Sequence, residues 1–153
     1  MPPWLQVILL AALPVTELRA ALPIAITVFH FSPLEALLLS AFGCFLPVPV
    51  IYYLLNPALH FVRARSAAFD KFVEQYFHTL KHRYQERFER WGAFALAVFV
   101  AIPLPGFGAW SGALLAVLFG IRAGYALPAM AVGVVVQGLI VLAVTTGSIA
   151  LIT

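Results

Sequence analysis

The sequence predicts an all-α integral membrane protein built as an inverted repeat, in which each half has a re-entrant helical hairpin and one transmembrane helix. Three observations lead to this fold class. The 153 residues are 63% hydrophobic and only 10% charged, whereas charged residues make up about a quarter of a soluble domain. Two of the four apolar blocks are interrupted near their centres. The basic residues are concentrated in one segment between the second block and the third.

The four apolar blocks span residues 4–31, 34–55, 92–121 and 125–152. A membrane-spanning helix needs about 20 residues, so the second and fourth blocks each fit a single crossing. The first and third blocks are divided into halves that, at about 1.5 Å per residue, are too short to cross a hydrocarbon core of about 30 Å. Each of these two blocks is therefore expected to enter and leave the membrane on one side. The shared layout of the two halves indicates an inverted repeat, although the sequence identity between the halves is low.

The interruptions lie at residues 14–23 and 102–110. The first contains two charged residues between two prolines, and the second contains prolines and glycines before a tryptophan. Non-helical backbone at membrane depth persists only where protein covers it or where it lines a polar cavity, and paired broken segments mark transport sites. The residues predicted to serve transport, substrate binding or proton binding are Pro14, Glu17, Arg19, Pro23, Pro103, Pro105, Gly106, Gly108, Trp110 and Ser111.

Glu17 and Arg19 are the strongest candidates, because a charged side chain at membrane depth costs about 2.5 to 3.5 kcal/mol on insertion scales. In the functional interpretation Glu17 exchanges a proton or holds a cation, and Arg19 binds an anionic head group or a counter-charge. Two alternatives stay open: the two residues pair with each other or cap hairpin backbone, or the segment does not lie deep. On a regular helix the two side chains would point to different faces, a constraint that a hairpin tip removes.

The second interruption brings no charge. Its prolines and glycines free backbone amides and carbonyls and allow close approach. Trp110 and Ser111 could donate hydrogen bonds there, or they could serve packing and helix capping. Gln137 in the last span and Arg122 before it are secondary candidates, and Gln137 is expected to join helices more often than to contact a substrate. Cys44 is expected to be a small packing residue.

Segment 57–91 is predicted to be an amphipathic helix that connects a first repeat, residues 1–56, to a second repeat, residues 92–153, within one membrane domain. Seven of the nine Lys and Arg residues lie in it, so the positive-inside rule places residues 60–91 on the cytoplasmic side of a multi-pass protein of the inner membrane. Its apolar stripe at helical spacing is expected to lie along the membrane interface. The stripe consists of Phe69, Phe72, Val73, Tyr76, Leu80, Tyr84, Phe88 and Trp91.

Several classes of function are disfavoured. The chain shows no nucleophile beside a base, no glycine-rich phosphate loop and no cysteine pair, so an enzyme is not expected. Acidic residues interleave with the basic ones, which disfavours nucleic acid as a partner. Glu74, His78, His82 and Glu86 recur at steps of four and could form a surface metal site, but a solvated helix face with local ion pairs is the favoured interpretation. Neither a metal nor a cofactor is expected.

Two topologies compete for this chain. With the connector inside, re-entrant hairpins place Arg122 in the cytoplasm, whereas four simple crossings place it outside; the arginine favours the hairpins. Two crossings and two half-depth hairpins leave apolar flanks exposed to membrane lipids. At least a homodimer is therefore expected, with close packing through small residues such as Ala129, Ala131 and Gly133.

The motifs TELRAALP and IPLPGFGAWSGALLA resemble the small multidrug export protein family, which looks like a compact branch of the DedA and VTT-domain membrane proteins. The resemblance covers nearly the whole chain and implies two opposed re-entrant hairpins. For the wider group it also implies movement of lipids or lipid carriers, often with proton coupling. Glu17 and Arg19 match the first motif, and Pro103, Pro105, Gly106 and Trp110 match the second. DedA proteins usually carry arginines around the second motif, which has none here.

Two functional hypotheses follow. In the first, the chain is a transporter or flippase-like carrier for a small amphiphile, a cation or a lipid-linked substrate, with the hairpin tips meeting near the midplane and Glu17 as the coupling acid. In the second, it is a membrane-homeostasis or scaffold protein that does not transport and acts through its basic connector. Neutralising Glu17 should matter most in the first case, and removing the basic face of residues 63–90 in the second.

Overall fold

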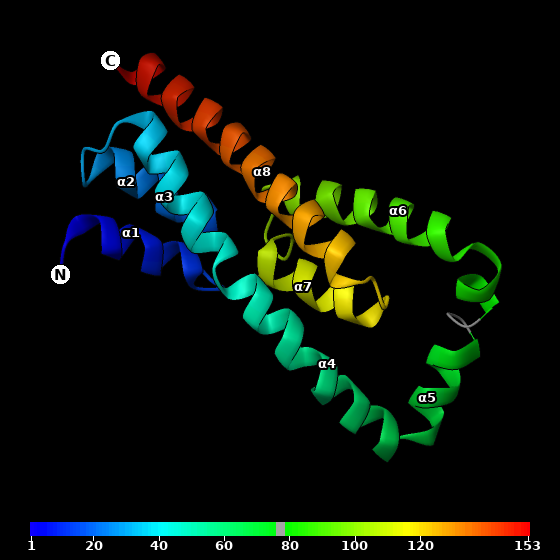
Figure 1. The fold of residues 1–153 in the computed structure, drawn as a ribbon. Coiled ribbons are helices and arrows are strands. Elements are labelled where there is room, and N and C mark those ends of the chain that lie inside the picture. The colour runs from blue at the N-terminus through cyan, green and yellow to red at the C-terminus, as the bar shows by residue number, and fades with distance from the viewer. Residues whose placement is uncertain (76–78) are drawn as a thin grey trace.

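The computed structural model describes residues 1–75 and 79–153, apart from the side chains of residue 73 and residues 79–88. All regular structure in these ranges is helical (Figure 1), which confirms the predicted all-α class. The helices are α1 (Pro3–Ala12), α2 (Glu17–Thr27), α3 (Pro33–Phe45), α4 (Pro47–Arg65), α5 (Ala67–Val73), α6 (Thr79–Ala101), α7 (Ala109–Leu118) and α8 (Ala123–Ile152).

The first apolar block folds as a helical hairpin of α1 and α2, packed against α3. α1 stops because the residue before Pro14 is driven into an extended conformation: Leu13 has φ −75° and ψ 140°. Gly43 on α3 makes the close contact with α1 possible, since a Cβ there would lie 2.5 Å from the carbonyl oxygen and 2.8 Å from the Cα of Ile8. The expected break within the first block is therefore present.

Two helical stretches are long and apolar enough to cross a membrane. Pro33–Arg65, which joins α3 and α4, has 33 residues and a mean hydropathy of 2.0, and Ala123–Ile152 has 30 residues and a mean hydropathy of 2.4. The first stretch starts at a capping box in which Ser32 Oγ accepts from the Glu35 amide at 3.4 Å, while the Glu35 carboxylate accepts from the Ser32 amide at 3.0 Å. These stretches contain the two segments that were expected to cross the membrane.

The connector is not the single helix that was predicted. α4 continues to Arg65, Ser66 then takes an extended conformation (φ −120°, ψ 100°), and its Oγ accepts from the Phe69 amide at 3.4 Å to start α5. α6 begins at Thr79 inside the connector and runs on into the third apolar block. Eight residues of the predicted apolar stripe and metal group lie outside the side chains that the structure describes. They are Val73, Tyr76, His78, Leu80, His82, Tyr84, Glu86 and Phe88.

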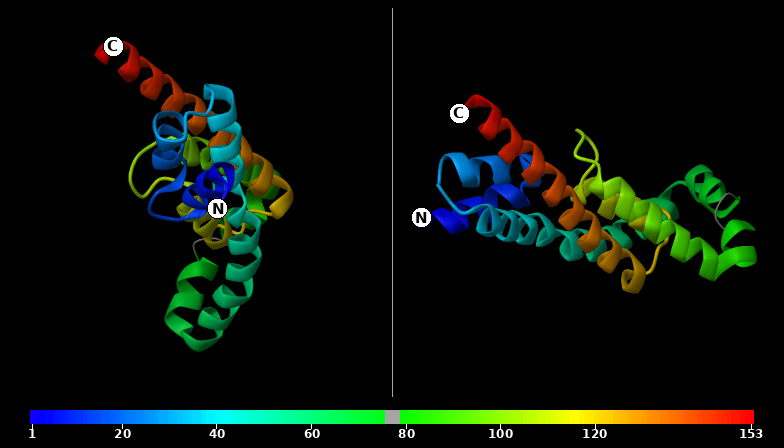
Figure 2. Two further views of the ribbon diagram at one scale, coloured as in Figure 1. Left: turned by 90° about the vertical axis from the view of Figure 1, so that its left-hand side faces the viewer. Right: turned by 90° about the horizontal axis from the view of Figure 1, so that it is seen from above.

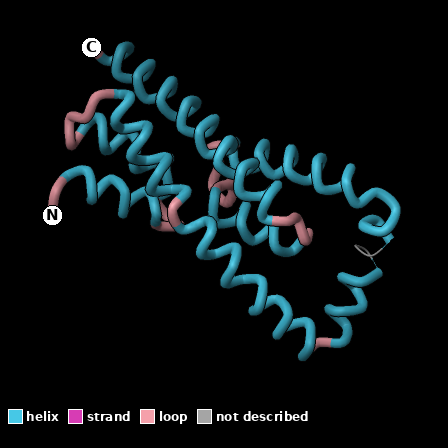
Figure 3. The backbone as a smooth tube through the Cα atoms, viewed as in Figure 1, coloured by secondary structure: helices cyan, strands magenta, loops and turns pink. Residues whose placement is uncertain are grey.

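The third block forms a second helical hairpin, from α6 and α7, followed by α8. The loops at the tips of both hairpins are short stretches between helices (Figure 3). α7 ends in a glycine turn, because Gly120 has φ +65° and the Ile121 amide donates to the Ala116 carbonyl at 3.0 Å. This turn sends the chain directly into the last long helix.

The two halves interlock (Figures 1 and 2). α1 packs on α3 and α6 packs on α8, but the second arm of each hairpin contacts the other half, α2 on α8 and α7 on α4. Gly133 serves this packing within the chain, since a Cβ there would lie 2.7 Å from the Ala97 carbonyl oxygen and 2.9 Å from the Val100 Cβ. Gly133 therefore packs within the chain, and the expected homodimer stays a prediction. Both termini lie at one end of the molecule and α5 at the other (Figure 2).

Candidate functional site

The tips of the two hairpins meet in the middle of the molecule. The indole Nε1 of Trp110, at the start of α7, donates a hydrogen bond to the carbonyl of Ala12, at the end of α1, at 3.1 Å. The last carbonyls of a helix have no partner within it, so the tryptophan satisfies one of them from the other half of the chain. The two interruptions, nearly 100 residues apart in sequence, are thereby joined.

Glu17 lies at the centre of this contact, with only 4% of its surface exposed. Its carboxylate interacts with the backbone amide of Trp110. It also lies over Gly108, where an added Cβ would be 2.5 Å from Glu17 Oε1 and 2.7 Å from Cδ. The carboxylate thus occupies the amino end of α7, where the helix dipole favours negative charge. Gly108 is needed because any side chain there would displace it.

Glu17 and Arg19 form an ion pair. Arg19 Nη2 lies 3.7 Å from Glu17 Oε2, which is too long for a hydrogen bond. The guanidinium Nε of Arg19 is buried and has no hydrogen-bond partner among the described residues. Both predicted roles of Glu17 that do not involve transport, pairing with Arg19 and capping hairpin backbone, are therefore present in the structure.

The backbone of Glu17 adopts an uncommon conformation. Its φ of +44° lies in the left-handed region, which costs a residue other than glycine about 1 to 3 kcal/mol and is concentrated at functional sites. α2 starts at this residue, so the carboxylate and Arg19 are not related by regular helical geometry. This explains how two side chains only two positions apart can approach each other.

Cys44 completes the contact and was not singled out by its sequence context. The thiol is 1% exposed, interacts with the backbone amides of Leu18 and Ala109, and lies close enough to Glu17 to interact electrostatically. α3 therefore contributes to the site along with the two tips. We call Glu17, Arg19, Cys44, Gly108 and Trp110 the tip junction.

The other residues predicted for the site lie around the junction and not within it. Ser111 Oγ accepts a hydrogen bond from the Gly108 amide at 3.1 Å, so it caps α7. Pro14, Pro105 and Gly106 are exposed, and Gly106 supplies the turn through its φ of +83°. Pro105 and Gly106 belong to the loop between α6 and α7, which projects from the bundle (Figure 2).

Two further prolines belong to the hairpin arms. Pro23 lies inside α2 and is half-buried, and because a proline has no N–H it leaves the carbonyl four residues earlier, that of Arg19, without its helical donor. Pro103 follows the end of α6 and is also half-buried. They shape the arms beside the junction.

Two buried polar side chains lie on the long helices that cross beside the tips. Gln137 on α8 is fully buried, and neither of its amide atoms has a hydrogen-bond partner in the described part of the chain. Ser40 on α3, one helical turn before Cys44, is likewise buried with its hydroxyl unpartnered among the described residues. Unsatisfied buried polar groups are rare in folded proteins and call for an explanation. The expected role of Gln137 in joining helices by hydrogen bonds is not seen in these ranges.

Arg122 lies far from the junction and pairs with Glu89, a residue that the charge pattern had assigned to the solvated connector. Its Nε and Nη2 donate to the two carboxylate oxygens of Glu89 at 2.8 and 2.9 Å. Glu89 is 1% exposed, whereas the Arg122 side chain is 65% exposed. This bidentate pair ties the start of α8 to α6 at the end of the molecule that carries α5.

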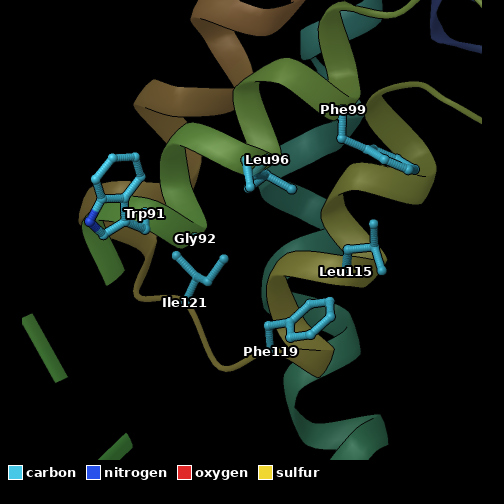
Figure 4. A pocket seen from close by; sticks show the side chains of 8 residues that line it. Trp91, Gly92, Leu96, Phe99, Leu115, Phe119 and Ile121 are labelled. Carbon is cyan, nitrogen blue, oxygen red and sulfur yellow. The ribbon is translucent and has the colours of Figure 1, made fainter. Parts of the chain in front are cut away.

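An apolar pocket of about 390 Å³ separates α6 from α7 near that same end. Figure 4 shows Leu96 and Phe99 of α6 facing Leu115 and Phe119 across it. Trp91 forms its rim and is 70% exposed. All of its described lining residues are uncharged, so this part of the pocket is a surface for apolar contact and not part of the tip junction.

The comparisons with known proteins identify one family. A family model described as "Putative small multi-drug export protein" matches residues 17–140. No curated protein and no solved structure matches the chain significantly. The match confirms the small multidrug export part of the resemblance seen in the two motifs, while the relationship to the DedA proteins stays a prediction.

Proposed function

Because the chain belongs to the small multi-drug export protein family, we propose that it exports small amphiphilic or cationic molecules along a path through the tip junction. The observation that carries this proposal is a buried carboxylate between two broken helical segments. Glu17 is 4% exposed and is held by the amide of Trp110. An acid kept at such a depth is costly and marks ion or substrate pathways in membrane proteins.

Glu17 has the properties of a coupling acid in this proposal. In its ionised form it is stabilised by Arg19 and by the amino end of α7, and its long 3.7 Å separation from Arg19 leaves the pair weak. A cationic substrate or a proton can therefore compete with Arg19 for the carboxylate. Ser40 and Gln137 have buried polar atoms without a hydrogen-bond partner among the described residues, and these atoms would offer polar contacts to a substrate.

The membrane arrangement that we propose is an inverted repeat of re-entrant hairpins. α2 has 11 residues and α7 has 10, so at about 1.5 Å per residue neither reaches across a core of about 30 Å. The pair between Arg122 and Glu89 supports the arrangement, because it brings both open ends of the second hairpin to the end that carries the connector. The positive-inside rule then places this end in the cytoplasm.

This topology predicts that the carboxyl terminus lies outside the cytoplasm, since α8 starts at the connector end and crosses once. A carboxyl-terminal fusion to a reporter that is active only in the cytoplasm should therefore be inactive, and a fusion within the connector should be active. Four simple crossings would reverse the first result. An active terminal fusion would thus contradict the re-entrant arrangement while leaving the tip junction intact.

Neutralising Glu17 should abolish transport. In proteoliposomes with a pH gradient, Glu17→Gln is expected to reduce substrate-dependent flux to the level of empty vesicles, because the amide can neither exchange a proton nor balance a cation. Glu35→Gln is the matched control: it removes an exposed carboxylate, and glutamine can still complete the capping box with Ser32. The control should transport as the parent does.

Folding must be measured alongside flux, since Glu17 also caps α7. A Glu17→Gln protein that keeps the helical circular dichroism and thermal transition of the parent, but not its flux, supports the coupling role. Equal flux in Glu17→Gln and the parent would show that the carboxylate is structural and that the proposal is wrong.

A further inference from the structure

A second, polar cavity opens at the connector end of the molecule and lies outside the proposed transport path. It has a volume of about 300 Å³ and is enclosed by α4 and by the turn between α7 and α8. From α4, Tyr52, Asn56, Leu59 and Arg63 recur at helical spacing and share one face. The residues lining the cavity are Tyr52, Asn56, Leu59, His60, Arg63, Val117, Gly120 and Arg122.

The charge of this cavity is one-sided. Among the described residues, its lining contains two arginines and a histidine and no acidic side chain. The acidic partners lie outside the lining: Arg63 Nε donates to Asp70 at 3.0 Å, and Arg122 donates to Glu89 at 2.8 Å. These contacts fix the orientation of both guanidinium groups. Arg122 is also the N-cap residue of the 30-residue helix α8, whose amino end adds partial positive charge.

The cavity wall is held by a buried hydrogen bond. The hydroxyl of Tyr52, which is 6% exposed, donates to the carbonyl of Ile121 at 2.5 Å, and the side chain of Asn56 interacts with the same tyrosine. α4 is thereby connected to the turn that carries Arg122. The two arginines are thus held on opposite walls of a pre-formed space.

An apolar groove continues from the cavity between α4 and α7. It has a volume of about 160 Å³ and shares Leu59 and Val117 with the polar cavity. The rest of its lining is aliphatic, namely Leu55, Ala58, Val62, Leu114 and Leu118. A basic cavity joined to an aliphatic groove has the two-part chemistry of a phospholipid.

We propose that this cavity binds the phosphate head group of an anionic phospholipid between Arg63 and Arg122, with an acyl chain in the adjoining groove. Basic pockets between membrane helices on the cytoplasmic side are known to hold anionic head groups. The site lies at the connector end of the molecule. The positive-inside rule places this end at the cytoplasmic leaflet, where anionic lipids are available. It does not depend on whether Glu17 couples transport.

The test uses the purified full chain in a non-ionic detergent, titrated with phosphatidylglycerol or with phosphatidylcholine of the same acyl chains, with binding followed by native mass spectrometry. The parent should bind phosphatidylglycerol more tightly. Arg63→Gln should weaken that binding about five-fold, the contribution of one basic residue near an anionic lipid, and leave phosphatidylcholine unchanged. Equal affinities of the parent for the two lipids would overturn the proposal.

Two matched variants separate a site from general surface charge and from structural damage. Arg65→Gln removes the same charge two residues along α4, from an exposed side chain that stacks over Phe61 and does not line the cavity; it should keep the parent's affinity. Asp70→Asn breaks the ion pair of Arg63 but keeps its charge, so it should also bind. Loss of binding in either variant equal to that in Arg63→Gln would contradict the site.

A final arm distinguishes a lipid from a free anion. Excess inorganic phosphate should not displace phosphatidylglycerol, because it lacks the chain that occupies the groove. Displacement would show that the cavity recognises phosphate alone and would overturn the lipid assignment. If Arg63→Gln loses helical circular dichroism, His60→Gln takes its place in the test. His60→Gln should also weaken phosphatidylglycerol binding.

Discussion

Replacing Arg122 by glutamine should destabilise the folded protein by about 3 kcal/mol, the usual cost of removing one partner from a buried ion pair. Glu89 is 1% exposed and receives two hydrogen bonds from Arg122, at 2.8 and 2.9 Å. Without the guanidinium, an ionised carboxylate stays buried with no compensating charge from α8. The free energy of unfolding in detergent micelles, followed by circular dichroism, measures this loss.

The reverse change should cost less. Glu89→Gln removes the buried charge and leaves Arg122, whose side chain is 65% exposed, to be hydrated; a loss of about 1 kcal/mol is expected. Adding Glu89→Gln to Arg122→Gln should therefore recover stability. Arg90→Gln, on an exposed neighbour of Glu89, is the charge-matched control and should be near neutral. If Arg122→Gln is no worse than Arg90→Gln, the pair does not hold α6 to α8.

Gly108→Ala should both destabilise the protein and abolish transport. The added Cβ would lie 2.5 Å from Glu17 Oε1, so the carboxylate must leave the amino end of α7. Overpacking of this kind costs about 1 to 3 kcal/mol. Gly108 has φ −178° and ψ −171°, an extended conformation open to alanine, so the collision with Glu17 is the only cause expected.

A double variant isolates that collision. Glu17→Ala removes the carboxylate. In a protein that already carries Glu17→Ala, the change Gly108→Ala should therefore cost little further stability, although transport should remain absent. Gly147→Ala is the control, since a Cβ at Gly147 meets nothing within 4 Å; in a helix it should be neutral or stabilise by up to about 1 kcal/mol. If the losses of stability caused by Glu17→Ala and Gly108→Ala add up in the double variant, the two residues do not touch.

Local sequence signals predicted much of this fold. Apolar length identified the two long helices, and prolines located the breaks at residues 14–23 and 102–110, because both depend on nearby residues and on backbone geometry. The meeting of the two tips also followed from the shared layout of the halves. What the layout did not reveal is the asymmetric contact, in which the carboxylate of Glu17 lies at the amino end of α7.

Pairings between distant elements were the part that sequence reasoning missed. Glu89 stands among charged neighbours in the connector, and only the tertiary approach of α8 buries it against Arg122. Cys44 looked like a packing residue because its immediate neighbours in sequence are apolar, and its electrostatic interaction with Glu17 comes through the fold. Pro105 and Gly106 were predicted for the site from their type, but the turn that they form places them on the exposed side of the loop.

The interlocking of the halves bears on the order in which the protein is assembled. α2 packs on α8 and α4 packs on α7, so neither half is complete without a helix of the other. The amino-terminal half is synthesised first, so Glu17 is present before the amide of Trp110 exists. Arg19 belongs to the same half as Glu17, so their ion pair can form before the second hairpin is made.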